Sequence, residues 1–275
     1  MITLYEFGNS VCCQKVRMTL ALKGLTWQSV QVNLFKSEQY DEKYLKLNPK
    51  GVVPTLVHDD KSIIESTLIC EYLDQVFPEP RLTPNDPYLL SQMRLWSKMV
   101  DEGLHEGISE ISFSAMFREK MKHMTDEQRE VRFQNIGDPK RYDRFKSTYE
   151  QGVESRFVGY AIAAYEKMFV ELEKALSHRG SWILGDQLTL ADINLIPYIA
   201  RLNYLQLLGV WISDRPLTQA WWERIQFIPE FMTSIHEPML ESEISDMKHY
   251  GQQIASSVQA IRLEQLAKRA LQSVR

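Results

Sequence analysis

The sequence has little cysteine and no long apolar run. It holds three cysteines in 275 residues: Cys12, Cys13 and Cys70. An odd number with two of them adjacent argues against a disulfide framework, and it predicts reduced thiols. No apolar stretch approaches the roughly 20 residues that cross a bilayer. We therefore expect no membrane-spanning helix and no membrane partner.

The chain also lacks an excess of positive charge, since its net charge is -4. This balance gives no electrostatic footprint for nucleic acid, so we expect no nucleic-acid partner. We predict no metal site. The N-terminal residues MITLYEFGNS carry no basic region. We expect them to form a first strand rather than a signal peptide, which makes the cytoplasm the expected compartment.

The first 80 residues alternate between strand and helix patterns. Strands are predicted over residues 2–7, 30–34, 53–57 and 62–64. Helices are predicted to end near Gly24, to cover residues 37–47 and to cover residues 66–76. The order is βαβ followed by αββα, so this part of the chain is predicted to be an α/β domain.

A proline-rich segment over residues 77–87 then marks a domain boundary. Helical periodicity dominates after it, over residues 88–124, 158–176 and 190–208. The highly charged residues 125–150 are interpreted as an exposed excursion between helices. The predicted organisation has four parts: an α/β domain over 1–80, a linker over 81–90, an all-helical domain over 91–239 and an amphipathic helical tail over 240–275.

Residues 10–17, which read SVCCQKVR, lie where a strand gives way to a helix. Unpaired backbone N–H groups and the positive end of the helix dipole stabilise a thiolate at such a place. Ser10 is a candidate donor to a bound thiolate. Cys12, beside Lys15 and Arg17, is a candidate acidic thiol if it is exposed. The alternative is that Ser10 only caps the helix and the cysteines fill apolar space.

Two further segments are candidates for ligand binding. If the Val53–Pro54 bond is cis, the Val53 backbone is turned to pair with a peptide ligand; otherwise Pro54 merely opens a strand. Ser66 is predicted to cap the helix over 66–76, whose N-terminus is suited to a carboxylate, with Glu65 suited to an ammonium. The alternative is an ordinary cap after a solvated acid.

Residues 189–192, TLAD, form a variant of the capping box with Asp192 in place of the usual Glu or Gln. We predict a structural role for this box as the start of a central helix.

Taken in order, these motifs resemble the cytosolic glutathione S-transferase superfamily over nearly the whole chain. The resemblance implies a thioredoxin-like βαβαββα domain with a mixed four-stranded sheet, then an all-α domain. It implies an enzyme with glutathione as co-substrate, a hydrophobic or aromatic electrophile as second substrate, and a homodimer. The implied glutathione-binding residues are Gln39, Val53, Pro54, Glu65 and Ser66, with Ser10 and Cys12 as the catalytic candidates.

The subgroup stays open at this point. Residues 10–17 resemble zeta-like enzymes and tetrachlorohydroquinone dehalogenase, in which the cysteine at position 12 takes part in chemistry. Residues 65–73 and 125–156 resemble bacterial β-etherases, which lack that cysteine. The alternatives are a dehalogenase or isomerase that uses Cys12, and a non-enzymatic glutathione-binding or interaction module. Apolar residues over 96–117 are expected to face the electrophile or to be core: Trp96, Met99, Phe113, Met116 and Phe117.

Overall fold

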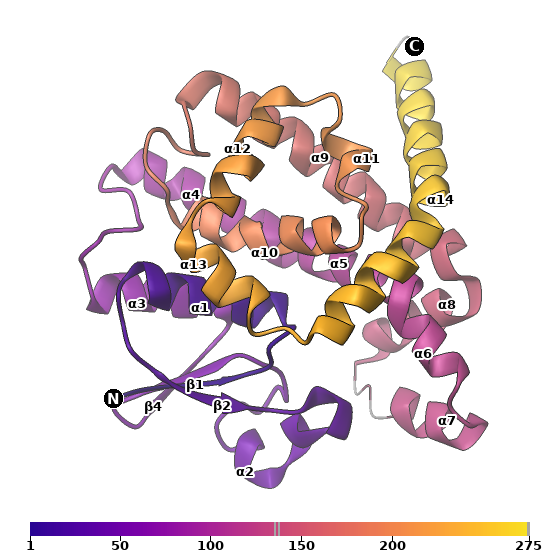
Figure 1. Cartoon of the computed structure of the whole chain (residues 1–275), viewed down its shortest axis with the longest axis horizontal. Helices are drawn as coiled ribbons and strands as arrows, with labels where there is room; N and C mark the ends of the chain where they lie inside the picture. Colours follow the sequence, from indigo (N-terminus) through magenta and orange to yellow (C-terminus); the bar gives the residue numbers. More distant parts are fainter. Residues whose placement is uncertain (135, 137, 274–275) are drawn as a thin grey trace. The chain divides into compact units, whose positions relative to one another are not determined.

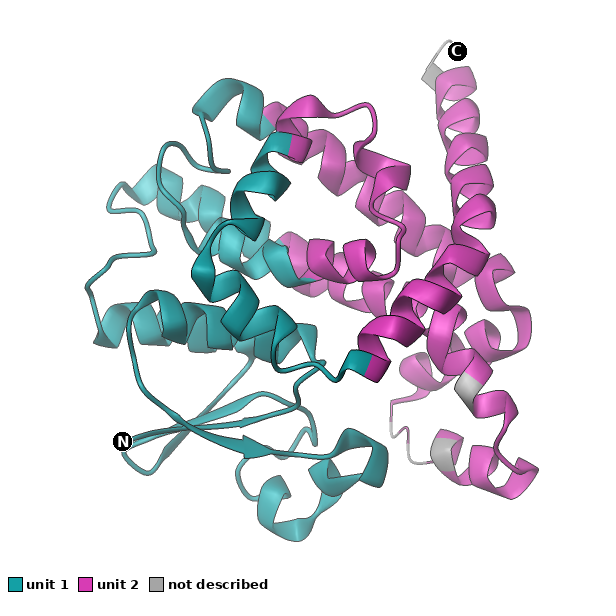
Figure 2. Ribbon diagram, viewed as in Figure 1, with its two compact units in different colours: residues 1–98, 175–197, 220–241 teal, residues 99–174, 198–219, 242–275 magenta. Residues whose placement is uncertain are grey.

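The computed structural model describes residues 1–134, 136 and 138–273 of the chain (Figure 1). The chain divides into two compact units (Figure 2). Unit 1 comprises residues 1–98, 175–197 and 220–241, and unit 2 comprises residues 99–174, 198–219 and 242–275. Unit 1 therefore contains the predicted α/β domain together with helical segments from much later in the chain. The boundaries expected near residues 80, 91 and 240 stay a prediction.

A four-stranded mixed sheet forms the base of unit 1, with the strand order β2-β1-β3-β4. Its strands are β1 (Ile2–Glu6), β2 (Gln28–Gln31), β3 (Thr55–His58) and β4 (Lys61–Ile64). β1 is parallel to β2 and antiparallel to β3, which in turn pairs antiparallel with β4. Parallel neighbours need a crossover, and α1 (Val11–Leu22) supplies it. The predicted mixed four-stranded sheet is confirmed.

The continuous helix predicted over residues 37–47 is wrong. The segment instead forms two short helices, η2 (Glu38–Tyr40) and α2 (Glu42–Leu45), which follow η1 (Leu34–Lys36). Asn33 accepts hydrogen bonds from two backbone N–H groups that follow it, and Ser37 has a φ of 62°. Local side-chain bonds and a left-handed residue compete with a regular helix, so the segment cannot propagate one.

Helices α1 and α3 (Ser66–Val76) pack together in unit 1. Their buried residues, with those of the sheet, form an apolar core that includes Leu4, Val16, Leu20, Leu56, Ile69 and Leu73. A buried ion pair joins Lys23, at the end of α1, to Asp74 of α3 at 2.7 Å. Asp74 also accepts hydrogen bonds from the backbone of Leu82 and Thr83. This carboxylate therefore fixes the start of the proline-rich connector.

The predicted capping box at residues 189–192 is confirmed. The carboxylate of Asp192 accepts the Thr189 N–H at 3.1 Å, and the Thr189 hydroxyl accepts the Ala191 N–H at 3.3 Å. The same carboxylate accepts the Ile183 N–H and the indole N–H of Trp221. α10 (Leu190–Tyr204) therefore starts at a fully satisfied buried cap.

The remaining longer helices of both units are α4 (Pro87–Met99), α5 (His105–Ser112), α6 (Arg118–Lys122), α9 (Arg156–Arg179) and α12 (Pro216–Gln226). Short helices follow α10 and α12, at α11 (Gly209–Ile212), α13 (Pro229–Phe231) and the π-helical η6 (Met232–His236). Two π-helical segments, η3 (Val100–Leu104) and η4 (Phe113–Phe117), interrupt the chain from α4 to α6. The helical prediction for residues 88–124 is confirmed, but the sequence analysis did not predict the two π-helical segments.

The exposed excursion between helices that was expected over residues 125–150 is itself largely helical, although most of its described residues are at least partly exposed. It forms α7 (Asp126–Gln134) and α8 (Pro139–Gln151), and residues 135 and 137 lie outside the described residues. Asp138 caps α8, and Pro139 takes the first helical position that suits proline. Aromatic, methionine and isoleucine side chains pack beneath both helices in one cluster: Phe113, Met121 and Phe133, with Phe117, Met124, Ile136, Tyr142, Phe145 and Tyr149.

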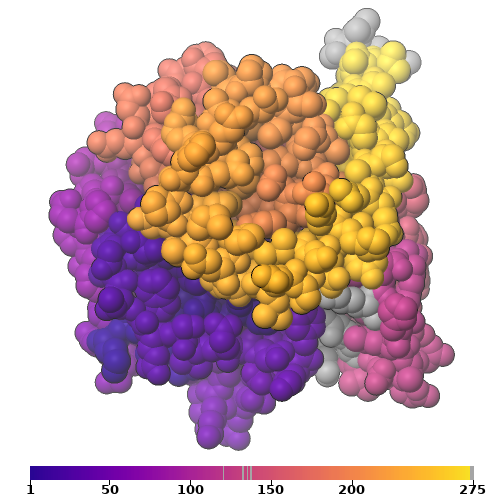
Figure 3. Space-filling view, viewed as in Figure 1, coloured from indigo at the N-terminus to yellow at the C-terminus, as the bar shows by residue number. Residues whose placement is uncertain are grey.

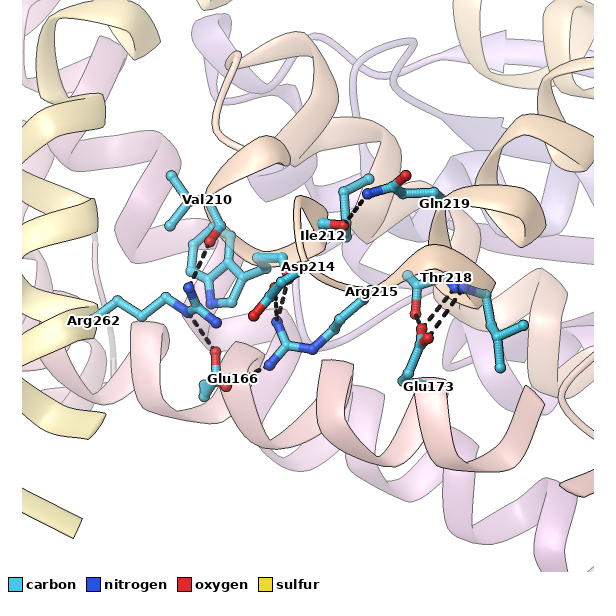
Figure 4. Close-up of polar contacts among 11 residues, drawn as sticks. Glu166, Glu173, Val210, Ile212, Asp214, Arg215, Thr218, Gln219 and Arg262 are labelled. Atoms are coloured by element: carbon cyan, nitrogen blue, oxygen red, sulfur yellow. Dashed lines mark hydrogen bonds and ion pairs between the residues drawn. The ribbon is translucent and has the colours of Figure 1, made fainter. Parts of the chain in front are cut away.

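The predicted helical tail is α14 (Glu241–Ser273), and residues 274–275 lie outside the described residues. A side chain at Gly251 would overlap the carbonyl oxygen of Leu205, so the tail backbone lies directly against the end of α10. Further along the tail, Arg262 bonds to Glu166 of α9 (Figure 4). Beyond these contacts the last turns of α14 stand clear of their neighbours (Figure 3).

Candidate active site

The strand register brings four chain segments to one edge of the sheet. Glu6, at the end of β1, pairs with Gln31, at the end of β2. Tyr5 pairs with Thr55, the first residue of β3, and Thr55 pairs with Ile64, the last residue of β4. The chain after β1, β2 and β4 and the chain before β3 therefore leave the sheet together. These segments carry the site residues predicted from the sequence: Ser10, Cys12, Gln39, Val53, Pro54, Glu65 and Ser66.

Ser10 is the N-cap of α1 and has extended backbone geometry. Its Oγ accepts the Cys13 N–H at 3.3 Å. A hydroxyl that accepts a hydrogen bond still has a proton to donate. Capping and donation to a ligand are therefore compatible at Ser10, and the two interpretations of this residue do not compete.

Cys13 is a buried and unreactive thiol. The side chain is fully buried, and Phe7 N–H lies 3.5 Å from its Sγ. Burial raises the pKa of the Cys13 thiol to about 12, against the opposing effects of the Arg17 charge and the Ser10 hydroxyl. Cys70 is likewise buried, with its Sγ next to the Thr19 hydroxyl at 3.2 Å.

Cys12 is half-buried, whereas the two cations expected to make it acidic are engaged elsewhere. Lys15 is completely buried and donates to the Thr67 hydroxyl at 2.8 Å. Arg17 is buried too, and it forms an ion pair with Glu6. Both cations therefore lie in the interior of the fold, and the acidity of Cys12 stays a prediction.

We predict that alkylation distinguishes the three cysteines. At about pH 8 the Cys13 thiol is roughly four pH units below its pKa, so only about one molecule in ten thousand carries the thiolate that reacts. Treatment of the folded protein with iodoacetamide should modify Cys12 and spare Cys13 and Cys70, as read by peptide mass spectrometry. The same treatment in denaturant, as the control, should modify all three. Modification of Cys13 in the folded protein would contradict its burial.

The loop before β3 contains Val53, whose backbone groups are available to a ligand. The Val53–Pro54 bond is cis, as the sequence interpretation required. Asn48 and Tyr44 both donate to the carbonyl oxygen of Val52, at 2.8 and 2.6 Å, and fix the loop from the inside. Within the described part of the chain, neither the N–H nor the C=O of Val53 takes part in a hydrogen bond. An extended peptide ligand could pair with both groups.

Ser66 is the first residue of α3 rather than its N-cap, so that prediction is wrong. The N-cap is Glu65, which has a φ of 68° and makes no capping side-chain bond. A non-glycine residue in this region costs about 1–3 kcal/mol, and such residues cluster at ligand sites. The Glu65 carboxylate pairs with Lys50 at 2.6 Å. The first N–H groups of α3 thus lack a side-chain cap, which leaves them suited to an anion.

Gln39 lies in η2, after β2. Its Oε1 is buried and has no hydrogen-bond partner among the described residues. Buried polar atoms of side chains are normally satisfied, so an exception calls for a ligand or water. This supports the interpretation of Gln39 as a binding residue.

Comparison with known proteins agrees with this geometry. Residues 4–81 match the model for the glutathione S-transferase N-terminal domain, and residues 131–224 match the model for the C-terminal domain. The chain is 33% identical over 270 residues to protein LigF of Sphingobium sp. strain SYK-6, covering 92% of this chain and 99% of LigF. The chain belongs to the glutathione S-transferase family.

Other members of the family are similar to this transferase over most of their length. Glutathione S-transferase Z1 of Arabidopsis thaliana is 30% identical over 240 residues, covering 86% of this chain and 92% of Z1. Maleylacetoacetate isomerase of Mus musculus is 30% identical over 200 residues, covering 72% of this chain and 76% of the isomerase. The crystal structure of the β-etherase LigF superposes with a TM-score of 0.74 at 31% identity, covering 85% of this chain and 98% of that one.

Family membership confirms the resemblance seen in the sequence. This transferase is an enzyme, and its co-substrate is glutathione. Among the described residues, no helix is long and apolar enough to cross a membrane. The same residues contain no group of three or more His, Cys, Asp or Glu side chains placed to hold a metal ion.

The apolar residues expected to face the electrophile divide into two groups. Trp96, Phe113 and Met116 are buried, and Phe113 belongs to the aromatic cluster beneath α7 and α8. These three serve as core. Met99 and Phe117 are only partly buried, and they stay candidates.

Sequence reasoning missed the residues that support the site from behind. Asn48 is almost fully buried and shapes the loop before β3, and Lys50 holds Glu65. The signal for Asn48 was its place before Pro49, in the loop that leads to β3. Lys50, a charged loop residue, offered no comparable signal.

Proposed function

We propose that this transferase cleaves aromatic β-aryl ethers with glutathione. The glutathione thiolate attacks the carbon that bears the aryloxy group, a C–S bond forms, and the C–O bond breaks to release a phenolate. The observation that carries the proposal is the similarity to the β-etherase LigF over nearly the full length of both chains. The arrangement of Ser10 and the open peptide-binding groups at one sheet edge supports it.

In this proposal glutathione lies along that edge. The Val53 backbone pairs with its cysteine, and the first turn of α3 at Ser66 receives the γ-glutamyl carboxylate. Glu65 offers its Oε2 to the γ-glutamyl ammonium, since its Oε1 is bonded to Lys50. Gln39, with its unpaired buried oxygen, holds the glycine end. Each assignment uses a group that the folded chain leaves open to a ligand.

Ser10 is the proposed catalytic hydroxyl. Its position at the N-terminus of α1 adds the field of a helix end to one hydroxyl donor. Both favour the thiolate form of glutathione over the thiol. A preformed thiolate held against an electrophilic carbon needs little further assistance.

The test is incubation with glutathione and a β-aryl ether dimer whose leaving phenol is fluorescent. The proposal expects equal release of phenol and glutathione conjugate, measured by fluorescence and mass spectrometry. A nitroaryl halide serves as a generic electrophile in parallel. Conjugation of the halide without phenol release would overturn the ether substrate while leaving transferase activity intact.

The second candidate function is a reaction that uses Cys12, as the sequence resemblance to zeta-like enzymes implies. Similarity to glutathione S-transferase Z1 and to maleylacetoacetate isomerase favours it, and the half-buried Cys12 is placed near Ser10. In a reductive dehalogenation the Cys12 thiolate would attack the sulfur of a glutathione conjugate, giving the reduced product and a mixed disulfide. A second glutathione would then resolve that disulfide to glutathione disulfide.

We predict that Cys12→Ser leaves ether cleavage within about twofold of wild type, because the glutathione thiolate alone performs the substitution. Steady-state phenol release measures this. Cys70→Ser provides a matched cysteine variant away from the sheet edge. Accumulation of a conjugate with no reduced product from a haloaromatic substrate would instead establish Cys12 as the nucleophile of the second candidate.

We also propose a cytoplasmic homodimer. Three unbridged cysteines support the reducing compartment. Large apolar side chains lie exposed on α3 and α4, which an ion pair between Glu71 and Arg94 joins: Leu68, Tyr88 and Leu95. Such side chains suit a subunit interface. We predict a dimer mass by light scattering at micromolar concentration; a monomer mass would refute it.

A further inference from the structure

Arg17 is a buried arginine on the second turn of α1 that has no part in the chemistry described so far. Its Nη1 forms an ion pair with Glu6, the last residue of β1. Its Nη2 donates to the carbonyl oxygen of Gly8 at 2.7 Å, and its Nε donates to the carbonyl oxygen of Ser234 in η6 at 2.7 Å. One planar guanidinium therefore joins the end of β1, the turn that leads to Ser10, and η6.

The bond from Arg17 to η6 follows from the local sequence. In an α-helix the carbonyl oxygen of Ser234 would accept the N–H of residue 238, but that residue is Pro238 and has no N–H. Arg17 supplies the missing donor. Gln14, three residues earlier on the same face of α1, donates to the neighbouring carbonyl oxygen of Ile235 at 3.4 Å. Two buried side chains of α1 thus hold η6 against this helix.

The chain just after η6 also contacts the turn that carries Ser10. A Cβ atom at Gly8 would overlap the carbonyl oxygen of Pro238, so the two backbones touch. The turn itself is closed by the Ser10 N–H, which donates to the carbonyl oxygen of Phe7 at 3.0 Å. Gly8 is therefore fixed twice, since Arg17 binds its carbonyl oxygen and Pro238 packs against its Cα.

We propose that Arg17 is a positioning residue, which ties η6 to the turn before α1 and so holds the Ser10 hydroxyl in place for the glutathione thiolate. The inference rests on the proposed role of Ser10. Arg17 acts through the Gly8 carbonyl oxygen and does not itself contact glutathione. Residues 232–238 thereby become part of the catalytic apparatus, although the match to the C-terminal domain model ends at residue 224.

The test is Arg17→Lys, which keeps a cation beside Glu6 but cannot form three divergent hydrogen bonds from one plane. With the nitroaryl halide as electrophile, kcat should fall about tenfold, because a small displacement of Ser10 weakens its hydrogen bond to the thiolate. KM for glutathione should change less than about twofold. The pKa of bound glutathione should rise, as measured by the near-ultraviolet absorbance of the thiolate.

Gly8→Ala tests the same contact from the other side. Its added Cβ has to displace Pro238, and the charge pair of Arg17 with Glu6 is left in place. We expect kcat to fall and the pKa of bound glutathione to rise, as in Arg17→Lys. This variant also carries the test should Arg17→Lys fail to fold.

A double-mutant cycle distinguishes positioning from a general loss of stability. If Arg17 acts through the Ser10 hydroxyl, Arg17→Lys should lower kcat by less than about twofold in the Ser10→Ala background. A full loss of about tenfold in that background would overturn the inference. So would an unchanged kcat and an unchanged pKa of bound glutathione in Arg17→Lys or Gly8→Ala.

Arg215→Lys is the matched control. Arg215 is a buried arginine of unit 2 that likewise binds a buried carboxylate, that of Glu166, and a backbone carbonyl oxygen, that of Trp211. Its replacement should destabilise the protein and leave the pKa of bound glutathione unchanged; an equal rise in this control would overturn the inference. Because the halide is the electrophile, a failure to cleave ethers overturns the proposed function alone.

Discussion

Replacing Glu166 by alanine is expected to lower the free energy of unfolding by about 3–5 kcal/mol. Glu166 is a buried carboxylate on α9 that serves two buried arginines (Figure 4). Its Oε1 accepts Arg215 Nη2 at 2.6 Å, and its Oε2 accepts Arg262 Nε at 2.6 Å. Alanine would leave two guanidinium groups buried without their shared counter-charge. Removing one partner of a buried ion pair destabilises a protein far more than replacing both partners by apolar residues.

Denaturant unfolding followed by circular dichroism measures this loss. Asp214→Ala is the matched control, since Asp214 is an exposed acid 3.7 Å from the same Arg215. An exposed pair of this kind contributes about 0–1 kcal/mol, so the control should stay close to wild type. A loss below about 1 kcal/mol for Glu166→Ala would show that solvent reaches the two arginines.

Replacing Ser10 by alanine is expected to lower kcat by about ten- to a hundredfold. The substitution removes the donor proposed for the glutathione thiolate. Loss of a donor to an oxyanion lowers kcat by about a hundred- to a thousandfold, and we expect a smaller effect here because the N-terminus of α1 still stabilises the thiolate. It also removes the side-chain cap of α1, which adds a stability loss of about 1 kcal/mol. The pKa of bound glutathione should rise, which the near-ultraviolet absorbance of the thiolate measures.

Ser66→Ala provides the contrasting variant. Ser66 is proposed to bind the ground state and the transition state alike, so its loss should raise KM for glutathione and leave kcat nearly intact. An unchanged pKa of bound glutathione in Ser10→Ala would remove Ser10 from its catalytic role. If Ser10→Ala raised only KM for glutathione and Ser66→Ala lowered kcat, the proposed roles of Ser10 and Ser66 would be exchanged.

Much of the sheet edge could be predicted from the sequence because its signals are local. The proline before β3 and the serine before α1 each carry turn or cap chemistry that needs no tertiary contact. Their convergence follows from strand order alone. By contrast, Glu65 is the N-cap of α3 because its φ is positive. The sequence Glu-Ser alone does not predict a positive φ at the glutamate.

Charge misled the sequence analysis in two places. In residues 125–150 the abundance of charged residues hid aromatic side chains whose spacing builds a hydrophobic cluster under α7 and α8. Lys15 and Arg17 were considered only as neighbours of Cys12, whereas both are buried and bond to Thr67 and Glu6. Burial of a paired charge is a tertiary property, so no local pattern reveals it.

The way the tail is attached sets rules for engineering the protein. Within unit 2, Arg262 of α14 contacts Glu166, and Gln265 donates to the Gly159 carbonyl oxygen. From residue 267 to residue 272 the helix is exposed at every position. A reporter domain or surface tether fused after this stretch would sit on a solvent-facing spacer. A deletion that reached Arg262 would instead leave the buried carboxylate of Glu166 without one of its two arginine partners.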